Sequence, residues 1–278
     1  MDSIIKNVTK SQIIEKPFPH LVLQNALPEE LYKQLALSYP SLEIITKIKT
    51  PESNKRFNLS TSHALNSLTI SSLWGDFLKT HTSQDFFNKF LDLFKEHILK
   101  TYPHFENKVG KLDKLTTGIR GINTFSHAKV LLDAQFAINT PVFGTPTSIR
   151  GTHLDRPNKL FTGLYYFRHP EDSSKGGDLE ICRLKKQDLI LREKEMDSQY
   201  FEVIKTIKYQ PNTLVLFLNT INSFHAVTVR EVTTFPRLFI NLLGEVEEPL
   251  FSLGKEQISL QKKIQRFFVK KVKRLVYG

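Results

Sequence analysis

The sequence contains a single cysteine and no apolar run long enough to cross a bilayer. Cys182 has no possible disulfide partner within the chain, which is typical of proteins from a reducing compartment. A membrane-spanning helix needs about 20 consecutive apolar residues. The opening residues, MDSIIKNVTKSQIIEK, also lack the apolar core and the small-residue cleavage site of a signal peptide. We therefore expect a cytoplasmic protein.

The chain also lacks internal repeats and low-complexity linkers. Its 278 residues are 40% hydrophobic and 11% aromatic, so a folded protein with a sizeable core is expected rather than a disordered one. The length suits one large domain with a small addition. We predict a domain over residues 1–248 and a basic tail over 249–278.

The positive charge of the chain is concentrated in this tail. The formal net charge is +11, and residues 255–274 contain eight Lys or Arg and one acid, Glu256. Residues 258–276 place apolar side chains along one side of a helix. Three interpretations stay open: a helix that docks on the core with its lysines solvated, an interfacial helix at the inner face of an anionic membrane, and an arm that binds nucleic acid.

The first 120 residues have the pattern of helical support. A short strand, Leu21–Leu23, leads to Pro28-Glu29-Glu30, which is a favourable first helical turn because free N–H groups and the helix dipole point there. The polar stretch 41–62 is expected to be a loop. Residues 73–100 carry apolar side chains at steps of three and four, which predicts one or two amphipathic helices.

After residue 120 the sequence predicts many short strands. The expected strands are 134–139, 159–167, 178–182, 201–208, 213–218, 226–232 and 237–243, with turn residues between them. The order of helices, then strands, then a basic helix predicts a mostly β protein with flanking helices (α+β). We expect a double-stranded β-helix (jelly roll, cupin-like) over 121–248, with the N-terminal helices packed on one sheet.

Three residues in this β region form a candidate metal site. His153 and Asp155 are two apart, so in extended chain they point to the same side. His225 follows an apolar strand and a polar turn, at a point where it can reach inward. Two imidazoles and one carboxylate are the ligands of non-haem Fe(II) oxygenases. A single histidine is more often a surface or core residue, and we assign no chemistry to the chain's other histidines.

A nearby arginine strengthens this interpretation. Arg237 opens the apolar strand RLFINLL, and a buried guanidinium is costly without a partner. A dicarboxylate cosubstrate would supply one through paired charge-assisted hydrogen bonds. Arg230 competes for this role, although it is equally well interpreted as a solvated hairpin charge.

Several segments resemble Fe(II)/2-oxoglutarate dioxygenases of the prolyl-hydroxylase-like superfamily. The segment THLDRPNKLFTGLYYF (152–167) resembles their His-x-Asp strand, and GGDLE (176–180) resembles the strand that follows. The segment 211–241 resembles the strands of the distal histidine and the cosubstrate arginine. The opening PFPHLVLQNALPEEL (17–31) resembles the N-terminal segment of bacterial and phage members. Arg237 lies slightly further from His225 than is usual in that family.

The resemblance implies roles for particular residues. It implies Fe(II) bound by His153, Asp155 and His225, with the far carboxylate of 2-oxoglutarate on Arg237. Gln135, Tyr165 and Asn241 are candidates for contacts with the cosubstrate. Asn241 is in phase with Arg237 on one strand.

The activity implied is hydroxylation of a substrate C–H bond with dioxygen, which releases succinate and CO2; ascorbate is a candidate reductant. The substrate class stays open between a protein side chain, a glycan or lipid-linked sugar, and a small metabolite. Loops at 42–63 and 119–130 are expected to select it, and their lysines and arginines favour an anionic substrate. A cupin-like sugar-binding or isomerase module is the alternative.

Overall fold

The computed structural model describes residues 1–185 and 196–253, so the predictions for the tail beyond residue 253 lie outside the described residues. The helices are α1 (Glu29–Leu37), α2 (Leu42–Thr46), α3 (Thr61–Leu65), α4 (Ser72–His81), α5 (Gln84–Thr101) and α6 (Phe105–Lys108). The strands are β1 (His20–Gln24), β2 (Arg56–Leu59), β3 (Thr117–Ile119), β4 (Val130–Asn139), β5 (Lys159–Tyr166), β6 (Leu179–Leu184), β7 (Phe201–Ile207), β8 (Thr213–Leu218), β9 (His225–Val227) and β10 (Arg237–Glu245). None of the described helices is long and apolar enough to span a bilayer.

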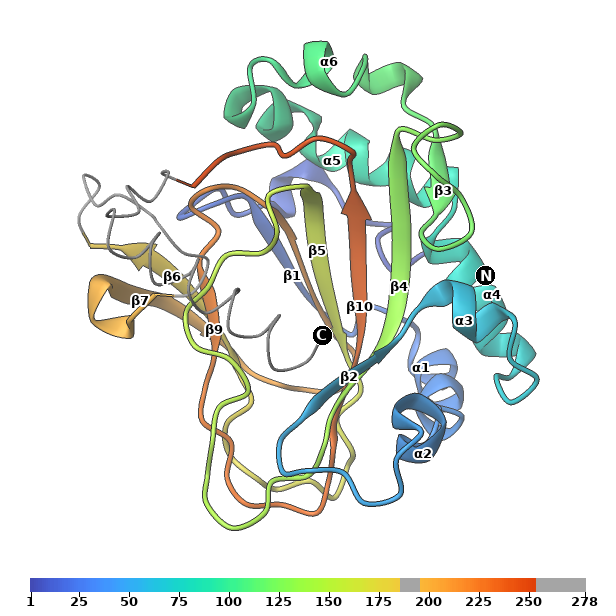
Figure 1. Ribbon diagram of the computed structural model, residues 1–278, viewed down its shortest axis with the longest axis vertical. Coiled ribbons are helices and arrows are strands. Elements are labelled where there is room, and N and C mark those ends of the chain that lie inside the picture. Colours follow the sequence, from blue (N-terminus) through green and yellow to red (C-terminus); the bar gives the residue numbers. More distant parts are fainter. Residues whose placement is uncertain (186–195, 254–278) are drawn as a thin grey trace, which may run out of the picture.

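The strands form two sheets with jelly-roll topology (Figure 1). The larger sheet has the order β1-β8-β5-β10-β4-β2, with β3 paired in parallel to β4, and the smaller has the order β7-β6-β9. An isolated pairing of His153 with His225 adds one more segment beside β9. From β4 onward the chain passes back and forth between the sheets, so the predicted double-stranded β-helix is confirmed.

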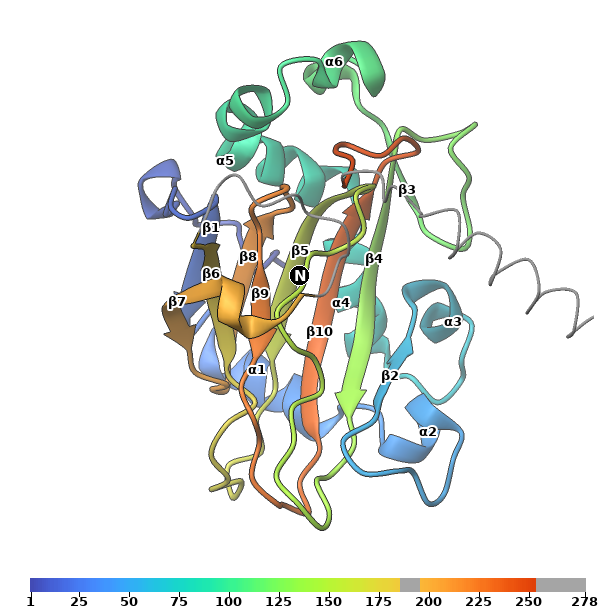
Figure 2. The ribbon, with the colours of Figure 1, turned by 60° about the vertical axis from the view of Figure 1, so that its left-hand side comes forward.

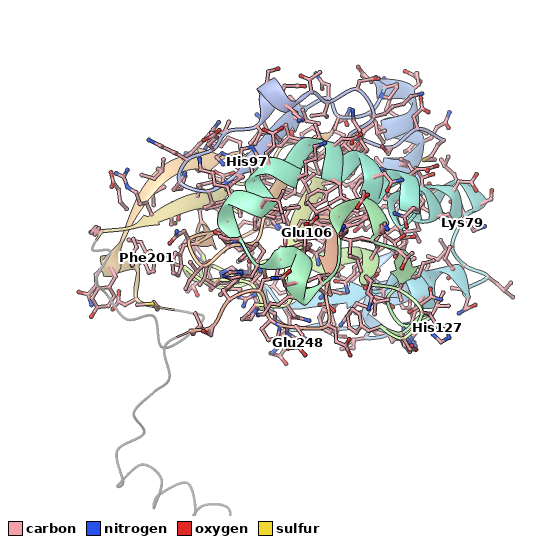
Figure 3. All side chains as sticks on the ribbon, turned by 90° about the horizontal axis from the view of Figure 1, so that it is seen from above. Lys79, His97, Glu106, His127, Phe201 and Glu248 are labelled. Carbon is pink, nitrogen blue, oxygen red and sulfur yellow. The ribbon has the colours of Figure 1, made fainter. Side chains whose placement is uncertain are left out.

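Helices cover the outer face of the larger sheet (Figure 2). In α5 the aromatic residues Phe86, Phe90 and Phe94 fall on one side and are buried. The ring of Phe90 packs 4.3 Å from that of Phe161 on β5. Viewed from above, α5 and α6, marked by His97 and Glu106, lie over the ends of the strands (Figure 3). The predicted amphipathic stretch 73–100 is thus two helices, α4 and α5.

Strand alternation divides the side chains of the larger sheet between the helices and the space between the sheets. On β10, Ile240 and Leu242 belong to the core beneath the helices. The alternate residues of β10 line a cavity between the sheets: Arg237, Phe239, Asn241, Leu243 and Glu245. This phase follows from the two-residue period of a strand, and it gives one wall of the cavity a polar row.

Two local predictions are wrong. Residues 41–62, expected as a loop, contain α2, β2 and the start of α3. These elements are short. In β2, Arg56 and Asn58 face the cavity while Phe57 and Leu59 pack against the core, and an alternation of only four residues is too brief to stand out in a polar stretch. The strand expected at 226–232 is only His225–Val227. The chain beyond it makes an isolated pairing between Arg230 and Thr147 instead.

The strain-prone Gly176–Gly177 turn supports a prediction on stability. Gly176 has φ +82°, and a Cβ there would overlap the carbonyl oxygen of Val229. We expect Gly176→Ala to lower the free energy of unfolding by about 1–3 kcal/mol from backbone strain alone, because alanine would be strained in this conformation. Urea unfolding measures the change.

Gly75 provides the matched control. It lies within α4, and a Cβ added there would have open space around it, with no neighbouring atom within 4 Å. Gly75→Ala should therefore raise stability by about 0.5–1 kcal/mol, because alanine is the better helix former. Equal stability of Gly176→Ala and the wild type would contradict the strain argument.

Candidate active site

The three predicted ligands converge on one wall of the cavity. The ligating atoms of His153, Asp155 and His225 lie within 4.8 Å of one another, and all three residues are buried. The pairing between the segment before β5 and β9 brings the histidines together. Their backbones exchange hydrogen bonds of 3.0 and 3.1 Å, and their ring centroids are 4.2 Å apart.

Backbone carbonyls orient both imidazoles. His153 Nδ1 lies 2.8 Å from the carbonyl oxygen of Gly151, and His225 Nδ1 lies 2.9 Å from that of Ser223. Because a carbonyl oxygen only accepts, each Nδ1 carries the proton and donates it. The Nε2 lone pairs are then available to a metal, in the arrangement that metal-binding histidines usually have.

The carboxylate of Asp155 is held by two contacts from β5. The Thr162 hydroxyl donates to Oδ2 at 2.6 Å, and the Lys159 ammonium lies 3.2 Å from Oδ1. Burial alone would raise the pKa of Asp155, but the Lys159 ammonium and the hydrogen bond from Thr162 help hold it well below its usual range. Asp155 is therefore ionised at neutral pH, and each oxygen keeps a further lone pair for a metal.

Both histidines of the triad are neutral at neutral pH, because burial disfavours the charged imidazolium. Burial lowers the pKa of His153 to about 2, with further repulsion from His225 and Arg150. Burial also lowers the pKa of His225. Two neutral imidazoles and one carboxylate fit a ferrous ion without having to release protons first. A triad of two histidines and one carboxylate beside a cavity is the ligand set typical of non-haem Fe(II) oxygenases.

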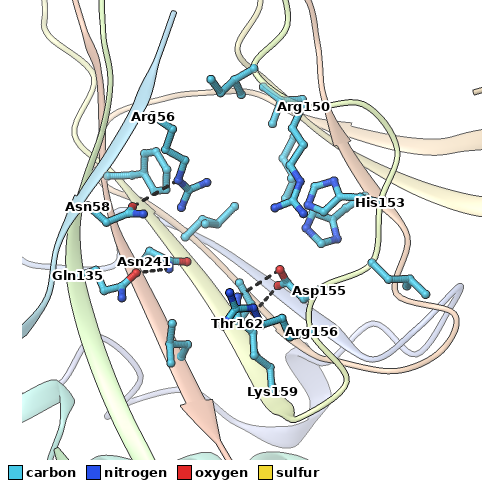
Figure 4. Close-up of a pocket in the computed structure, with 18 of the residues that line it drawn as sticks. Arg56, Asn58, Gln135, Arg150, His153, Asp155, Arg156, Lys159, Thr162 and Asn241 are labelled. Atoms are coloured by element: carbon cyan, nitrogen blue, oxygen red, sulfur yellow. Dashed lines mark hydrogen bonds and ion pairs between the residues drawn. The ribbon is translucent and has the colours of Figure 1, made fainter. Parts of the chain in front are cut away.

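The cavity beside the triad has a volume of about 620 Å³, which suits a small molecule. Figure 4 shows His153 and Asp155 on one wall, with Gln135 and Asn241 on the other. Asn241 Nδ2 donates to Gln135 Oε1 at 2.9 Å, and Gln135 Nε2 donates to Asp133 Oδ2 at 2.8 Å. The predicted residues Gln135 and Asn241 therefore do face the same space as the triad.

Arg237 lies in this cavity and is 2% exposed. Its Nε donates to the Gly177 carbonyl at 2.7 Å, which explains why the chain has glycine there: a Cβ on Gly177 would lie 3.2 Å from Arg237 Cδ. The guanidinium carbon is 4.7–4.9 Å from the ring centroids of Tyr166, Tyr209 and Phe239. Among the described residues Arg237 has no acidic partner, and its Nη2 is buried without a hydrogen bond.

Arg230 is a different case. It is also 2% exposed, but its Nη2 lies 2.8 Å from Asp172 Oδ2. Its interpretation as a solvated hairpin charge is therefore wrong, since it is a buried structural ion pair. Arg230 Nη1, like Arg237 Nη2, is buried without a hydrogen bond, but of the two arginines only Arg237 lines the cavity and lacks an acidic partner among the described residues.

The expectation that Tyr165 faces the cavity is also wrong. Tyr165 lies on the helix side of β5, where it packs against Tyr32 and Phe77 and donates to Asn212 Oδ1 at 2.7 Å. Its neighbour Tyr166 faces the space between the sheets. The Tyr166 hydroxyl is buried without a well-aligned partner among the described residues. Both faces of β5 are apolar, so periodicity in the sequence could not distinguish the two tyrosines.

Comparison with family models and with curated proteins gives no match for this chain. Solved structures of similar shape include a prolyl-4-hydroxylase of Pseudomonas putida, at 14% identity over 82% of this chain and 93% of that one (TM-score 0.43). A prolyl 4-hydroxylase of Phytophthora capsici is 13% identical over 92% and 68% (TM-score 0.45). A 2OG-Fe(II) oxygenase family oxidoreductase of Burkholderia pseudomallei is 11% identical over 83% and 86% (TM-score 0.42). With TM-scores below 0.5, these structures say nothing about the chemistry of the site, which is inferred from the geometry of this chain.

The Thr162–Asp155 hydrogen bond leads to a prediction on metal binding. Thr162→Val keeps the side-chain shape but removes the donor that orients Asp155, so metal affinity should fall about 10–100-fold. Titration with Mn(II), followed by electron paramagnetic resonance of the free ion, measures it. Thr206→Val on β7, where the side chain is exposed, is the control and should leave affinity unchanged. Equal affinity in both variants would contradict the role given to Thr162.

Proposed function

We propose that this protein is a non-haem Fe(II)- and 2-oxoglutarate-dependent dioxygenase that hydroxylates a C–H bond of its substrate. The observation that carries this proposal is the joint presence, in one cavity, of a buried His–Asp–His triad and a buried arginine without an acidic partner among the described residues. The first fits ferrous iron and the second fits the far carboxylate of a 2-oxo diacid.

In this proposal His153 and His225 bind the metal through Nε2, and Asp155 binds it through a carboxylate oxygen. When bound, the ferrous ion with 2-oxoglutarate supplies the oxidising chemistry, in which dioxygen gives one oxygen atom to succinate, formed with loss of CO2, and the other to the substrate C–H bond. The protein contributes position and shielding. Thr162 and Lys159 keep Asp155 ionised and oriented toward the metal.

Arg237 anchors the cosubstrate. Its Nη2 makes no well-aligned hydrogen bond among the described residues, and the Tyr166 hydroxyl, which interacts with Arg237, offers a second donor. The surrounding aromatic rings exclude water, which strengthens a charge-assisted hydrogen bond to a carboxylate. Gln135 and Asn241 are proposed to hydrogen-bond the cosubstrate or the substrate from the opposite wall.

A cupin-like sugar-binding or isomerase module is the alternative with the same fold. It would not need the unpaired Arg237, and it predicts no response of bound iron to 2-oxoglutarate. The membrane or nucleic-acid contacts expected of the basic tail concern residues outside the described part of the chain.

The role of Arg237 is tested by the substitution Arg237→Gln. Because hydrogen bonds to charged groups are worth about 1.5–3 kcal/mol, affinity for 2-oxoglutarate should fall about 10–100-fold. The measurement is an anaerobic titration of the Fe(II) protein, followed by the visible absorption of the iron–oxoacid chelate. The control ligand is 2-oxobutyrate, which lacks the far carboxylate. Its affinity should be the same in both proteins, and a similar loss for both ligands would reject the assignment.

The role of the triad is tested by Asp155→Ala. This substitution removes the only anionic ligand of the proposed metal site, so 2-oxoglutarate-dependent release of succinate should be abolished. Circular dichroism should show the fold intact, since Asp155 lies at a cavity wall rather than in the core. Unchanged succinate release by the folded variant would overturn the proposal.

A further inference from the structure

The cavity carries more positive charge than the proposed cosubstrate can neutralise. Two of its cationic residues have acidic partners: Arg120 bonds Glu245 at 2.9 Å, and Lys159 contacts Asp155 at 3.2 Å. The others have no acidic partner among the described residues: Arg56, Arg150, Arg156 and Arg237. If Arg237 binds 2-oxoglutarate, three arginines of the cavity are still unneutralised.

Arg56 and Arg150 approach the cavity from different segments of the chain. Arg56 projects from β2, is half-buried, and places its guanidinium carbon 4.7 Å from the centroid of Phe239. Its Nε donates to Asn58 Oδ1 at 3.3 Å, which fixes the side chain. Arg150 projects from the segment before His153 and is exposed at the cavity mouth. Figure 4 shows both side chains extending into the same space, with Arg150 beside His153 and Arg56 on the opposite side near Asn58.

This arrangement is electrostatically unfavourable without an anion. Burial lowers the pKa of Arg56 to about 10, and the positive charges of Arg237 and Arg150 contribute to this lowering. Like charges in a partly desolvated cavity repel one another, and a bound anion removes that cost. A ferrous ion bound by Asp155 would keep one net positive charge, and Arg237 carries another. The two negative charges of 2-oxoglutarate neutralise these two. A second anion would neutralise the charges of Arg56 and Arg150, which the cosubstrate leaves unmatched.

We propose that Arg56 and Arg150 form an oxyanion subsite and that the substrate is a phosphate ester of a small polar molecule. This inference rests on the proposed function, because it assumes that 2-oxoglutarate occupies Arg237. Guanidinium groups bind phosphate through paired hydrogen bonds, and two of them suit a dianion better than a single carboxylate. The amides of Asn58, Gln135 and Asn241 line the same cavity and offer hydrogen bonds to hydroxyl groups. Arg156 also lines the cavity, next to Asp155 and Lys159.

The test uses glycerol 3-phosphate as the probe, with glycerate and glycerol as matched ligands. Isothermal titration calorimetry is performed on the full chain loaded with Ni(II), an inert substitute for iron, and with 2-oxoglutarate. Glycerol 3-phosphate should bind, and Arg56→Gln and Arg150→Gln should each weaken it about 10–100-fold. Arg183→Gln is the control because Arg183 has the same charge but pairs with Glu202 outside the cavity; it should leave the affinity unchanged.

Each other outcome counts against the proposal. No binding of glycerol 3-phosphate, or equal binding by the wild type and both variants, rejects the subsite. Equal affinity for glycerate rejects the choice of phosphate, and equal affinity for glycerol rejects any role of charge.

Failure of this subsite can be distinguished from failure of the proposed function. Affinity for 2-oxoglutarate is measured in the same variants and should change far less than in Arg237→Gln. Normal cosubstrate binding without phosphate-ester binding rejects the subsite alone. A different result would be that the wild type binds glycerol 3-phosphate but neither metal nor 2-oxoglutarate, and that both arginine variants lose glycerol 3-phosphate. This result would reject the proposed function and support the anion site.

Discussion

The candidate site depends on one short pairing between two segments far apart in the sequence. His153 and His225 exchange backbone hydrogen bonds, and this single register places both imidazoles on the inner side of the smaller sheet. Leu154, Phe224 and Ala226 then point outward into a small apolar cluster. A shift by one residue would reverse both sets, exposing the apolar side chains and turning the ligands away. The packing of that cluster therefore holds the metal ligands in register.

The two buried arginines, Arg230 and Arg237, are equally buried but differ in whether an acidic side chain neutralises them. Arg230 is neutralised by Asp172, so its charge is satisfied within the fold. Arg237 contacts a glycine carbonyl and three aromatic rings but has no acidic partner among the described residues, which leaves its charge available to a ligand. Removing a guanidinium from water without a counter-ion is costly. Such a cost is tolerated where a ligand regularly supplies the missing charge.

Prediction from the sequence succeeded for elements with a strong apolar signal. The strands β5, β8 and β10 were identifiable as short apolar runs between turn residues, and the helices α4 and α5 by apolar residues at steps of three and four. Prediction failed for α2 and β2, which are only five and four residues long, too short for a periodic pattern to stand out from the polar residues around them. It also failed for Tyr165, because β5 is buried on both faces and alternation carries no information there.

The sequence by itself determined the chemistry that the site can offer: two imidazoles, a carboxylate two residues from one of them, and a basic residue at the start of the last strand. Residue type fixes charge and ligand atoms, and local spacing fixes which neighbours share a side. Only the tertiary structure decided that His225 joins the pair, that Arg237 rather than Arg230 is without a counter-ion among the described residues, and that Arg56 enters the same cavity. Those facts depend on strand register and on contacts between distant segments, which no local pattern in the sequence encodes.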